Sequence, residues 1–129
     1  MCGTVRLSSV EAERLREATG IYAKQWTTPA LCRAITGAPF EGFAQYEAFN
    51  TVWAPKLLKK FAVEIESFAE KTPSGERKWF ELPKSKKLII LKLIGFQYPI
   101  SSRLLTVPAK GQVRSIHDRM PAFLKEEAA

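Results

Sequence analysis

The spacing of apolar and polar residues predicts short elements of both kinds in the first part of the chain. Residues 4–7 alternate as a strand does, and Ser8 with Glu11 three residues later is the pattern of a helix N-terminus. Gly20 is a typical residue after the end of such a helix. The apolar side of this predicted helix is formed by Val10, Leu15 and Ala18.

A second strand and a second helix are predicted next. Residues 21–26 favour a strand, and Thr28-Pro29 is a good N-cap and first-turn pair for a short helix that ends at Gly37. Cys32 lies on the apolar side of this helix, so we expect a buried structural thiol.

The strongest helical pattern begins at Pro55, after an aromatic-rich segment over residues 38–50 that predicts a packed loop. Its apolar residues recur at spacings of three and four, as on the buried side of a helix: Leu57, Leu58, Phe61, Ile65 and Phe68. Its first half carries Lys56, Lys59 and Lys60, an order that opposes the helix dipole. These lysines either face phosphate or form a solvated surface.

The remaining residues predict strands separated by turns. Thr72-Pro73-Ser74-Gly75 is a turn sequence, residues 83–87 predict a basic turn, and residues 108–114 a loop or short turn. Strands are predicted over residues 78–82, 88–96, 103–107 and 122–124. Because strands outnumber helices without a βαβ rhythm, we expect an α+β fold. It would form one domain over residues 1–129, with a curved, mostly antiparallel sheet and a few flanking helices.

Composition narrows the classes of function. Lysine and arginine number 20 against 13 acidic residues, and this excess is compatible with a polyanionic partner, most simply nucleic acid. The longest apolar run, residues 88–96, is far shorter than the ~20 residues of a membrane span. No signal-peptide pattern is present, so we expect a cytoplasmic protein without membrane association. Two cysteines and one histidine cannot complete a structural zinc site, so neither a metal nor another cofactor is expected.

Cys2 is the first candidate for chemistry. A methionine followed by a small residue is the context in which the initiator methionine is removed, which would make Cys2 the mature N-terminus. Its amine and thiol have unperturbed pKa values of ~7.7–8.0 and ~8.5. Such a 1,2-aminothiol condenses with an aldehyde to an imine and then closes to a thiazolidine. A cysteine at this position without any function is the alternative.

Glu81 and His117 are the other candidates. Glu81 follows Trp79-Phe80 in a predicted strand, where burial would raise its pKa toward the range useful for general acid–base catalysis. An exposed glutamate on alternate strand positions is the other interpretation. His117 is the only histidine, and a structural role competes with a catalytic one. The sequence contains neither a nucleophile elbow nor a glycine-rich phosphate loop.

Two motifs together resemble the SRAP family, the abasic-site processing proteins also called SOS-response-associated peptidases. Met1-Cys2-Gly3 is similar to the start of that family, and residues 116–121, Ile-His-Asp-Arg-Met-Pro, to its histidine motif. Trp79-Phe80-Glu81 resembles the family's Gly-aromatic-aromatic-Glu-Trp strand. Phe49-Asn50 resembles its Phe-Asn-Ala-Arg segment, and residues 106–109 its Thr-x-x-Ala run.

The resemblance implies a mechanism in DNA repair. Cys2 would capture the C1′ aldehyde of a ring-opened abasic sugar and form a covalent thiazolidine cross-link that protects the lesion. Glu81 would transfer protons, His117 would assist ring opening or imine hydrolysis, and Asn50 would orient the Cys2 amine and the sugar. Lyase-type and autopeptidase activities are also implied, the latter reduced here to loss of Met1.

The implied partner is single-stranded or junction DNA with an abasic site, bound by a monomer through phosphates and shape. The expected DNA contacts are Lys56, Lys59, Lys60 and Arg119. Two arginines usual in the family are replaced by Thr4 and Val52, which leaves open a catalytically decayed, non-enzymatic module that binds single-stranded nucleic acid. A second alignment, with residues 50–55 matched to an earlier Tyr-Asn-x-Ala-Pro turn, would leave the catalytic asparagine unassigned.

Overall fold

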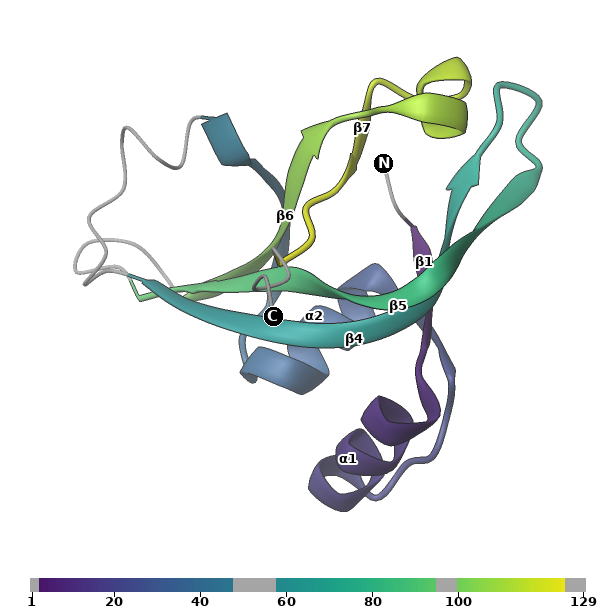
Figure 1. Cartoon of the computed structure of the whole chain (residues 1–129). Helices are drawn as coiled ribbons and strands as arrows, with labels where there is room; N and C mark the ends of the chain where they lie inside the picture. The colour runs from purple at the N-terminus through teal and green to yellow at the C-terminus, as the bar shows by residue number, and fades with distance from the viewer. Residues whose placement is uncertain (1–2, 48–57, 95–99, 125–129) are drawn as a thin grey trace, which may run out of the picture.

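The computed structural model describes residues 3–47, 58–94 and 100–124, and the statements below concern these residues (Figure 1). Its elements are β1 (Thr4–Leu7), α1 (Ser9–Thr19), β2 (Gln25–Thr27), α2 (Thr28–Thr36), β3 (Phe40–Gln45), β4 (Leu58–Lys71), β5 (Arg77–Leu93), β6 (Ser101–Pro108), the 3-10 helix η2 (Gly111–Ser115) and β7 (Arg119–Pro121). Within the described ranges, no helix combines the length and the apolar character needed to cross a membrane.

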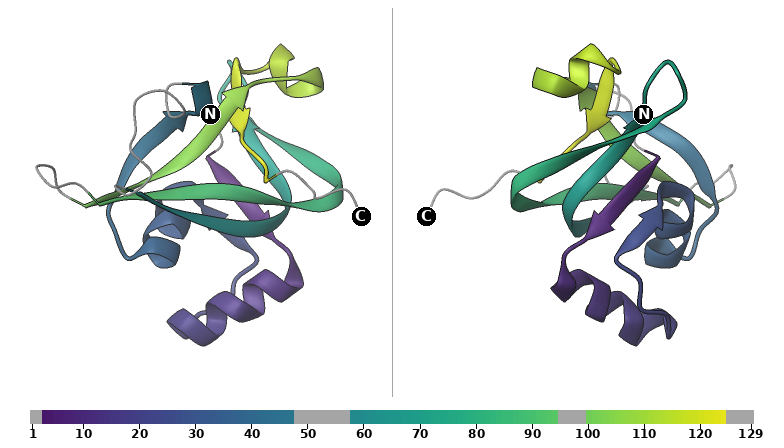
Figure 2. Two further views of the ribbon diagram at one scale, coloured as in Figure 1. Left: turned by 60° about the vertical axis from the view of Figure 1, so that its left-hand side comes forward. Right: turned by 90° about the vertical axis from the view of Figure 1, so that its right-hand side faces the viewer.

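The seven strands form one open sheet, and the α+β prediction is confirmed. The strand order is β2-β1-β4-β5-β6-β3, with β7 paired to β6. Among the described strands, β3 and β6 pair in parallel and the other pairs are antiparallel. Figures 1 and 2 show that β4 and β5 are long and curved, that α2 lies against the sheet, and that α1 lies beyond its end.

The predicted β1 and α1 are confirmed, and hydrogen bonds join the start of α1 to β4. The Ser8 hydroxyl accepts the Glu11 N–H at 3.2 Å and so caps the helix. The Glu11 carboxylate accepts the Glu64 N–H at 2.8 Å, and the Ser8 N–H donates to the Glu64 carbonyl at 3.2 Å. Of the predicted apolar side, Leu15 is buried, whereas Val10 and Ala18 are exposed.

The second helix is confirmed with small changes of boundary. Its cap residue is Thr27, one position earlier than predicted, and Gly37 ends it at a positive φ of 72°. The strand before it covers only Gln25–Thr27 rather than residues 21–26. Cys32 is fully buried, as predicted.

The helix predicted from Pro55 is wrong, because its described part is strand β4. Phe61, Val63 and Ile65 alternate as strand residues do, and the pairing register then shifts between Ile65 and Ser67. This β-bulge makes Phe68, three residues after Ile65, the next large apolar side chain in the core. A strand with a bulge therefore reproduced the spacing of a helix.

Two predicted loops are also strands. Within residues 38–50, β3 pairs in parallel with β6, Phe43 opposite Leu104, which places Phe40 and Phe43 on a sheet edge. The predicted basic turn at residues 83–87 lies inside β5. Lys87 still pairs with Glu64 there, so the chain does not reverse. The turn at residues 72–75 is confirmed, as are the strand around residues 103–107 and a short turn, η2, near residues 108–114.

The main core lies on the side of the sheet that α2 covers. Phe68 on β4 stacks on Phe80 of β5 with ring centroids 5.4 Å apart, and Phe123 lies 6.1 Å from Phe68. Leu31 and Cys32 of α2 belong to the same cluster. Each fully buried side chain of this size stabilises the fold by about 1.5–3 kcal/mol, so this cluster fixes the ends of β1 and β4 relative to each other.

Candidate functional site

A cavity of about 510 Å³ opens where β1 begins. The Gly3 N–H donates to the Ala69 carbonyl at 3.2 Å, and the Thr28 N–H donates to the Gly3 carbonyl at 3.0 Å. These bonds hold Gly3 between the end of β4 and the start of α2. The cavity, called the N-terminal pocket below, is lined by Gly3, Thr4, Thr27, Thr28, Pro29, Phe40, Phe43, Ala69, Glu70, Lys71, Arg77 and His117.

Glu70 is the acid of the N-terminal pocket. It is the second-last residue of β4 and is only 1% exposed. Burial raises the pKa of its carboxyl, an effect that nearby positive charge, including that of His117, offsets only in part. A carboxyl held in this way stays protonated at a higher pH than an exposed glutamate and can act as a proton donor as well as an acceptor.

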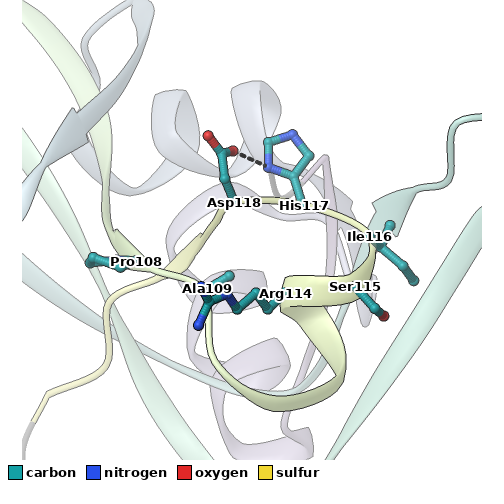
Figure 3. A pocket seen from close by; sticks show the side chains of 7 residues that line it. All are labelled: Pro108, Ala109, Arg114, Ser115, Ile116, His117 and Asp118. Carbon is teal, nitrogen blue, oxygen red and sulfur yellow. Dashed lines mark ion pairs between the residues drawn. The ribbon is translucent and has the colours of Figure 1, made fainter.

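His117 lines the N-terminal pocket from the segment between η2 and β7. The backbone N–H of His117 donates to the Val113 carbonyl at 2.8 Å, which anchors the segment to η2. Its Nδ1 lies 3.3 Å from the Arg119 N–H and 3.1 Å from the Asp118 carboxylate. The first contact suits an Nδ1 without a proton, and the second an Nδ1 that carries one. In either state Nδ1 faces the chain, and Nε2 points away from Asp118 (Figure 3).

A second cavity lies on another side of the histidine. It also measures about 510 Å³ and is lined by Pro108, Ala109, Arg114, Ser115, Ile116, His117 and Asp118 (Figure 3). Only His117 is common to the two cavities. The ring is therefore placed to contact a ligand in either one.

Glu81 lies elsewhere, and the burial predicted for it is wrong. Its side chain is 66% exposed, and a carboxylate oxygen lies 3.6 Å from the Arg6 guanidinium. Strand alternation explains the difference: Phe80 points into the core, so the next side chain points to solvent. Glu81 lines neither of the two cavities.

The predicted phosphate contacts differ in accessibility. Lys59 and Lys60 are exposed near the start of β4, where they pair with Lys92 and Leu91 of β5. They line neither cavity. Arg119 is only 15% exposed. Its guanidinium donates within the chain rather than facing solvent.

The partners of Arg119 are Glu47 and Thr106. One guanidinium nitrogen lies 2.8 Å from a Glu47 carboxylate oxygen, and another donates to the Thr106 carbonyl at 2.8 Å. The hydrogen bond from Arg119 lowers the pKa of the Glu47 carboxyl. Arg119 thus joins Glu47, two residues after the end of β3, to β6 and fixes the segment that carries His117.

Three predicted site residues, Cys2, Asn50 and Lys56, lie outside the described residues. Cys2 is covalently bonded to Gly3, which lines the N-terminal pocket. The other thiol, Cys32, is buried, and burial raises its pKa to about 12. In the described part of the chain, no group of three or more His, Cys, Asp or Glu side chains is placed to hold a metal ion.

Sequence reasoning missed Glu70, although its sequence carried a signal. Ser67-Phe68-Ala69-Glu70-Lys71 keeps one aromatic residue and the glutamate of the pattern that was assigned to Trp79-Phe80-Glu81. The helix predicted over this region gave no reason to place Glu70 in a site. Only the strand assignment brings its carboxyl to the side that faces His117.

Comparisons with protein-family models, curated proteins and solved structures find no match for this chain.

Proposed function

We propose that this protein processes abasic sites in single-stranded DNA by forming a thiazolidine cross-link through Cys2, as its resemblance to the SRAP family implies. One observation supports this most: a buried glutamate and the only histidine line one pocket together with Gly3, the residue that follows Cys2. An acid, an imidazole and an aminothiol are the groups that this chemistry needs. The proposal requires Cys2 to be the first residue of the mature protein.

The reaction balances without a cofactor. The Cys2 amine attacks the C1′ aldehyde of the ring-opened sugar, and loss of one water gives an imine. The thiol then adds to the imine carbon, and its proton moves to the nitrogen. The product is a five-membered thiazolidine ring that joins protein and DNA.

Glu70 takes the role that the sequence had assigned to Glu81. Its carboxylate accepts a proton from the Cys2 ammonium, and the resulting acid returns a proton to the oxygen that leaves as water. The raised pKa of Glu70 favours both steps, because the carboxyl keeps its proton at a higher pH than an exposed glutamate does. His117, at the border of the two cavities, assists sugar ring opening or hydrolysis of the imine.

The experiment is incubation with single-stranded DNA that contains one abasic site, followed by denaturing electrophoresis. We expect a denaturation-resistant adduct with the wild-type protein and none with Cys2→Ala. Cys2→Ser lacks the thiol, so it should give at most an imine that borohydride traps. Mass spectrometry of the purified protein reports whether Cys2 is its first residue.

Cys32→Ala is the matched control. The Cys32 thiol is buried and its pKa is raised to about 12, so it is almost entirely protonated near neutral pH and should take no part. An adduct that survives in Cys2→Ala and disappears in Cys32→Ala would reject the proposal.

One observation favours the second candidate, a module that binds single-stranded nucleic acid without chemistry. Thr4 stands where the family has arginine, and it is buried in β1. It therefore cannot replace an arginine at a phosphate. Salt-dependent DNA binding without any adduct, in a protein whose first residue is Cys2, would favour this candidate.

A further inference from the structure

We infer that the solvent-facing side of β1, β4 and β5, centred on Trp79 and Arg6, binds the single strand that leads into the N-terminal pocket. This inference rests on the proposed function for its choice of strand. It replaces the lysines predicted from sequence as the main DNA contacts.

The sheet register places these side chains side by side. Thr4, Ala69 and Trp79 are paired in one row across β1, β4 and β5, and Arg6, Ser67 and Glu81 form another row. Between these rows lie Val5, Phe68 and Phe80, which are buried in the core, so both outer rows point to the opposite side.

On this side the side chains of the middle strand, β4, are small. The side chains of β1 and β5 therefore meet above it. Ser67 and Ala69 are small and buried, and the Arg6 guanidinium carbon lies 4.8 Å from the centre of the Trp79 ring. Figure 2 shows β1 directly beside the β4–β5 hairpin that carries Trp79. The result is a cationic aromatic platform on the sheet surface.

Basic charge surrounds this platform. Arg77, two residues before Trp79, pairs with Lys71 across the hairpin, and both are exposed. Arg6 flanks the ring in the next row and is 37% exposed, with Glu81 as the one acid of the group. Neighbouring rows on one side of a sheet are about 6.6–6.8 Å apart, so cations stand on both sides of one ring.

The platform continues into the pocket. Thr4 and Ala69 share the row of Trp79, and they line the N-terminal pocket together with Lys71 and Arg77. Single-stranded DNA is the occupant that fits, because its phosphates suit the arginines and its bases stack on indole rings. A duplex offers no free base faces to Trp79.

The test measures binding of a labelled oligothymidylate by fluorescence anisotropy over a range of salt concentrations. Trp79→Leu keeps an apolar side chain but removes the stacking surface, and should weaken binding roughly 5- to 150-fold. Trp79→Phe should retain most of the affinity. Arg6→Gln and Arg77→Gln should each reduce the log–log salt slope by about 0.7, the share of one phosphate on a single strand.

Two variants outside the platform serve as controls. Lys59→Gln removes one exposed charge, and Tyr22→Leu removes one exposed aromatic ring. Thermal unfolding of every variant confirms the fold. If Trp79→Leu binds as tightly as the wild type, or if Lys59→Gln lowers the slope as much as Arg77→Gln, the inference is wrong.

A small aldehyde separates this inference from the proposed function. Deoxyribose 5-phosphate has no flanking strand, so it tests the chemistry alone, and the wild-type protein should react with it at Cys2. Failure of the wild-type protein to react with it would reject the chemistry and leave the binding result to decide the surface. Reaction at Cys2 without any effect of Trp79 on DNA binding would reject the surface alone.

Discussion

Glu70 and Glu81 lie on neighbouring strands of one hairpin and differ in burial, in their charged neighbours and in the side of the sheet they face. Glu70 is buried beside His117 and its pKa is raised, whereas Glu81 is 66% exposed beside Arg6. Glu70 pairs with Lys78 and Glu81 with Ser67, so the two carboxyls fall on opposite sides of the sheet. The comparison shows that the side of the sheet, and not the residue type or a flanking aromatic, decides whether a carboxyl is buried with a raised pKa.

The largest expected difference is in the rate of adduct formation. Glu70→Gln removes the proposed proton-transfer group and should slow single-turnover formation about 10²–10⁴-fold. Glu81→Gln should leave this rate within about twofold, because its carboxyl contacts solvent and Arg6. Denaturing gels sampled over time at several pH values measure both rates, and equal effects of the two substitutions would break the comparison.

The two substitutions should have the reverse order of effects on DNA affinity, with the larger change at Glu81. Glu81→Gln removes the one acid of the platform and should tighten binding of an oligothymidylate slightly. Glu70→Gln, on the pocket side, should leave that affinity unchanged.

Arg119→Gln tests whether Arg119 also contacts DNA. Its guanidinium is held by Glu47 and Thr106, so Arg119→Gln should lower the free energy of unfolding by about 1–3 kcal/mol. The log–log slope of DNA affinity against salt concentration should be the same for Arg119→Gln and the wild type. Urea unfolding and anisotropy titrations give the two values, and a slope reduced by about 0.7 would return Arg119 to the DNA contacts.

Glu70 should also make stability depend on pH. Because its pKa is higher in the folded protein, the folded state holds the Glu70 proton in a range where the unfolded state has lost it. Its contribution is therefore full below the ordinary glutamate pKa and is lost as pH rises through the folded pKa. Glu70→Gln should be more stable than the wild type at neutral pH, with the difference vanishing in acid.

Glu81→Gln is the control for this measurement. Unfolding midpoints of the three proteins across the acid range give the comparison. A wild-type protein that gains stability relative to Glu70→Gln as pH rises would contradict the assignment.

The smallest effect is expected at the turn that joins the two strands. Gly75 has a positive φ of 89° and open space around it, so Gly75→Ala meets backbone strain without a steric clash. We expect a loss of about 1–2 kcal/mol in unfolding free energy. Adduct rate and DNA affinity should not change, because the register of β4 and β5 is fixed by their paired residues. A changed adduct rate would show that the turn also shapes the pocket.

Local sequence determined the elements whose ends carry their own caps. Ser8 and Gly20 bound α1, Gly37 ends α2, and Thr72-Pro73-Ser74-Gly75 makes the hairpin turn. These features act within a few residues of the chain, so their physical causes are visible in the sequence. The buried Cys32 followed from the same local pattern.

Tertiary structure alone decided the rest of the site. The bulge after Ile65 gave a strand the apolar spacing of a helix. Residues 83–87 lie inside β5, where Lys86 and Lys87 pair with β4. The sequence identified His117 and pointed to a glutamate beside aromatic residues, but it selected Glu81. Which glutamate is buried depends on pairing register, and register is set by partners distant in the sequence, since a shift of one residue moves every side chain to the other side of the sheet.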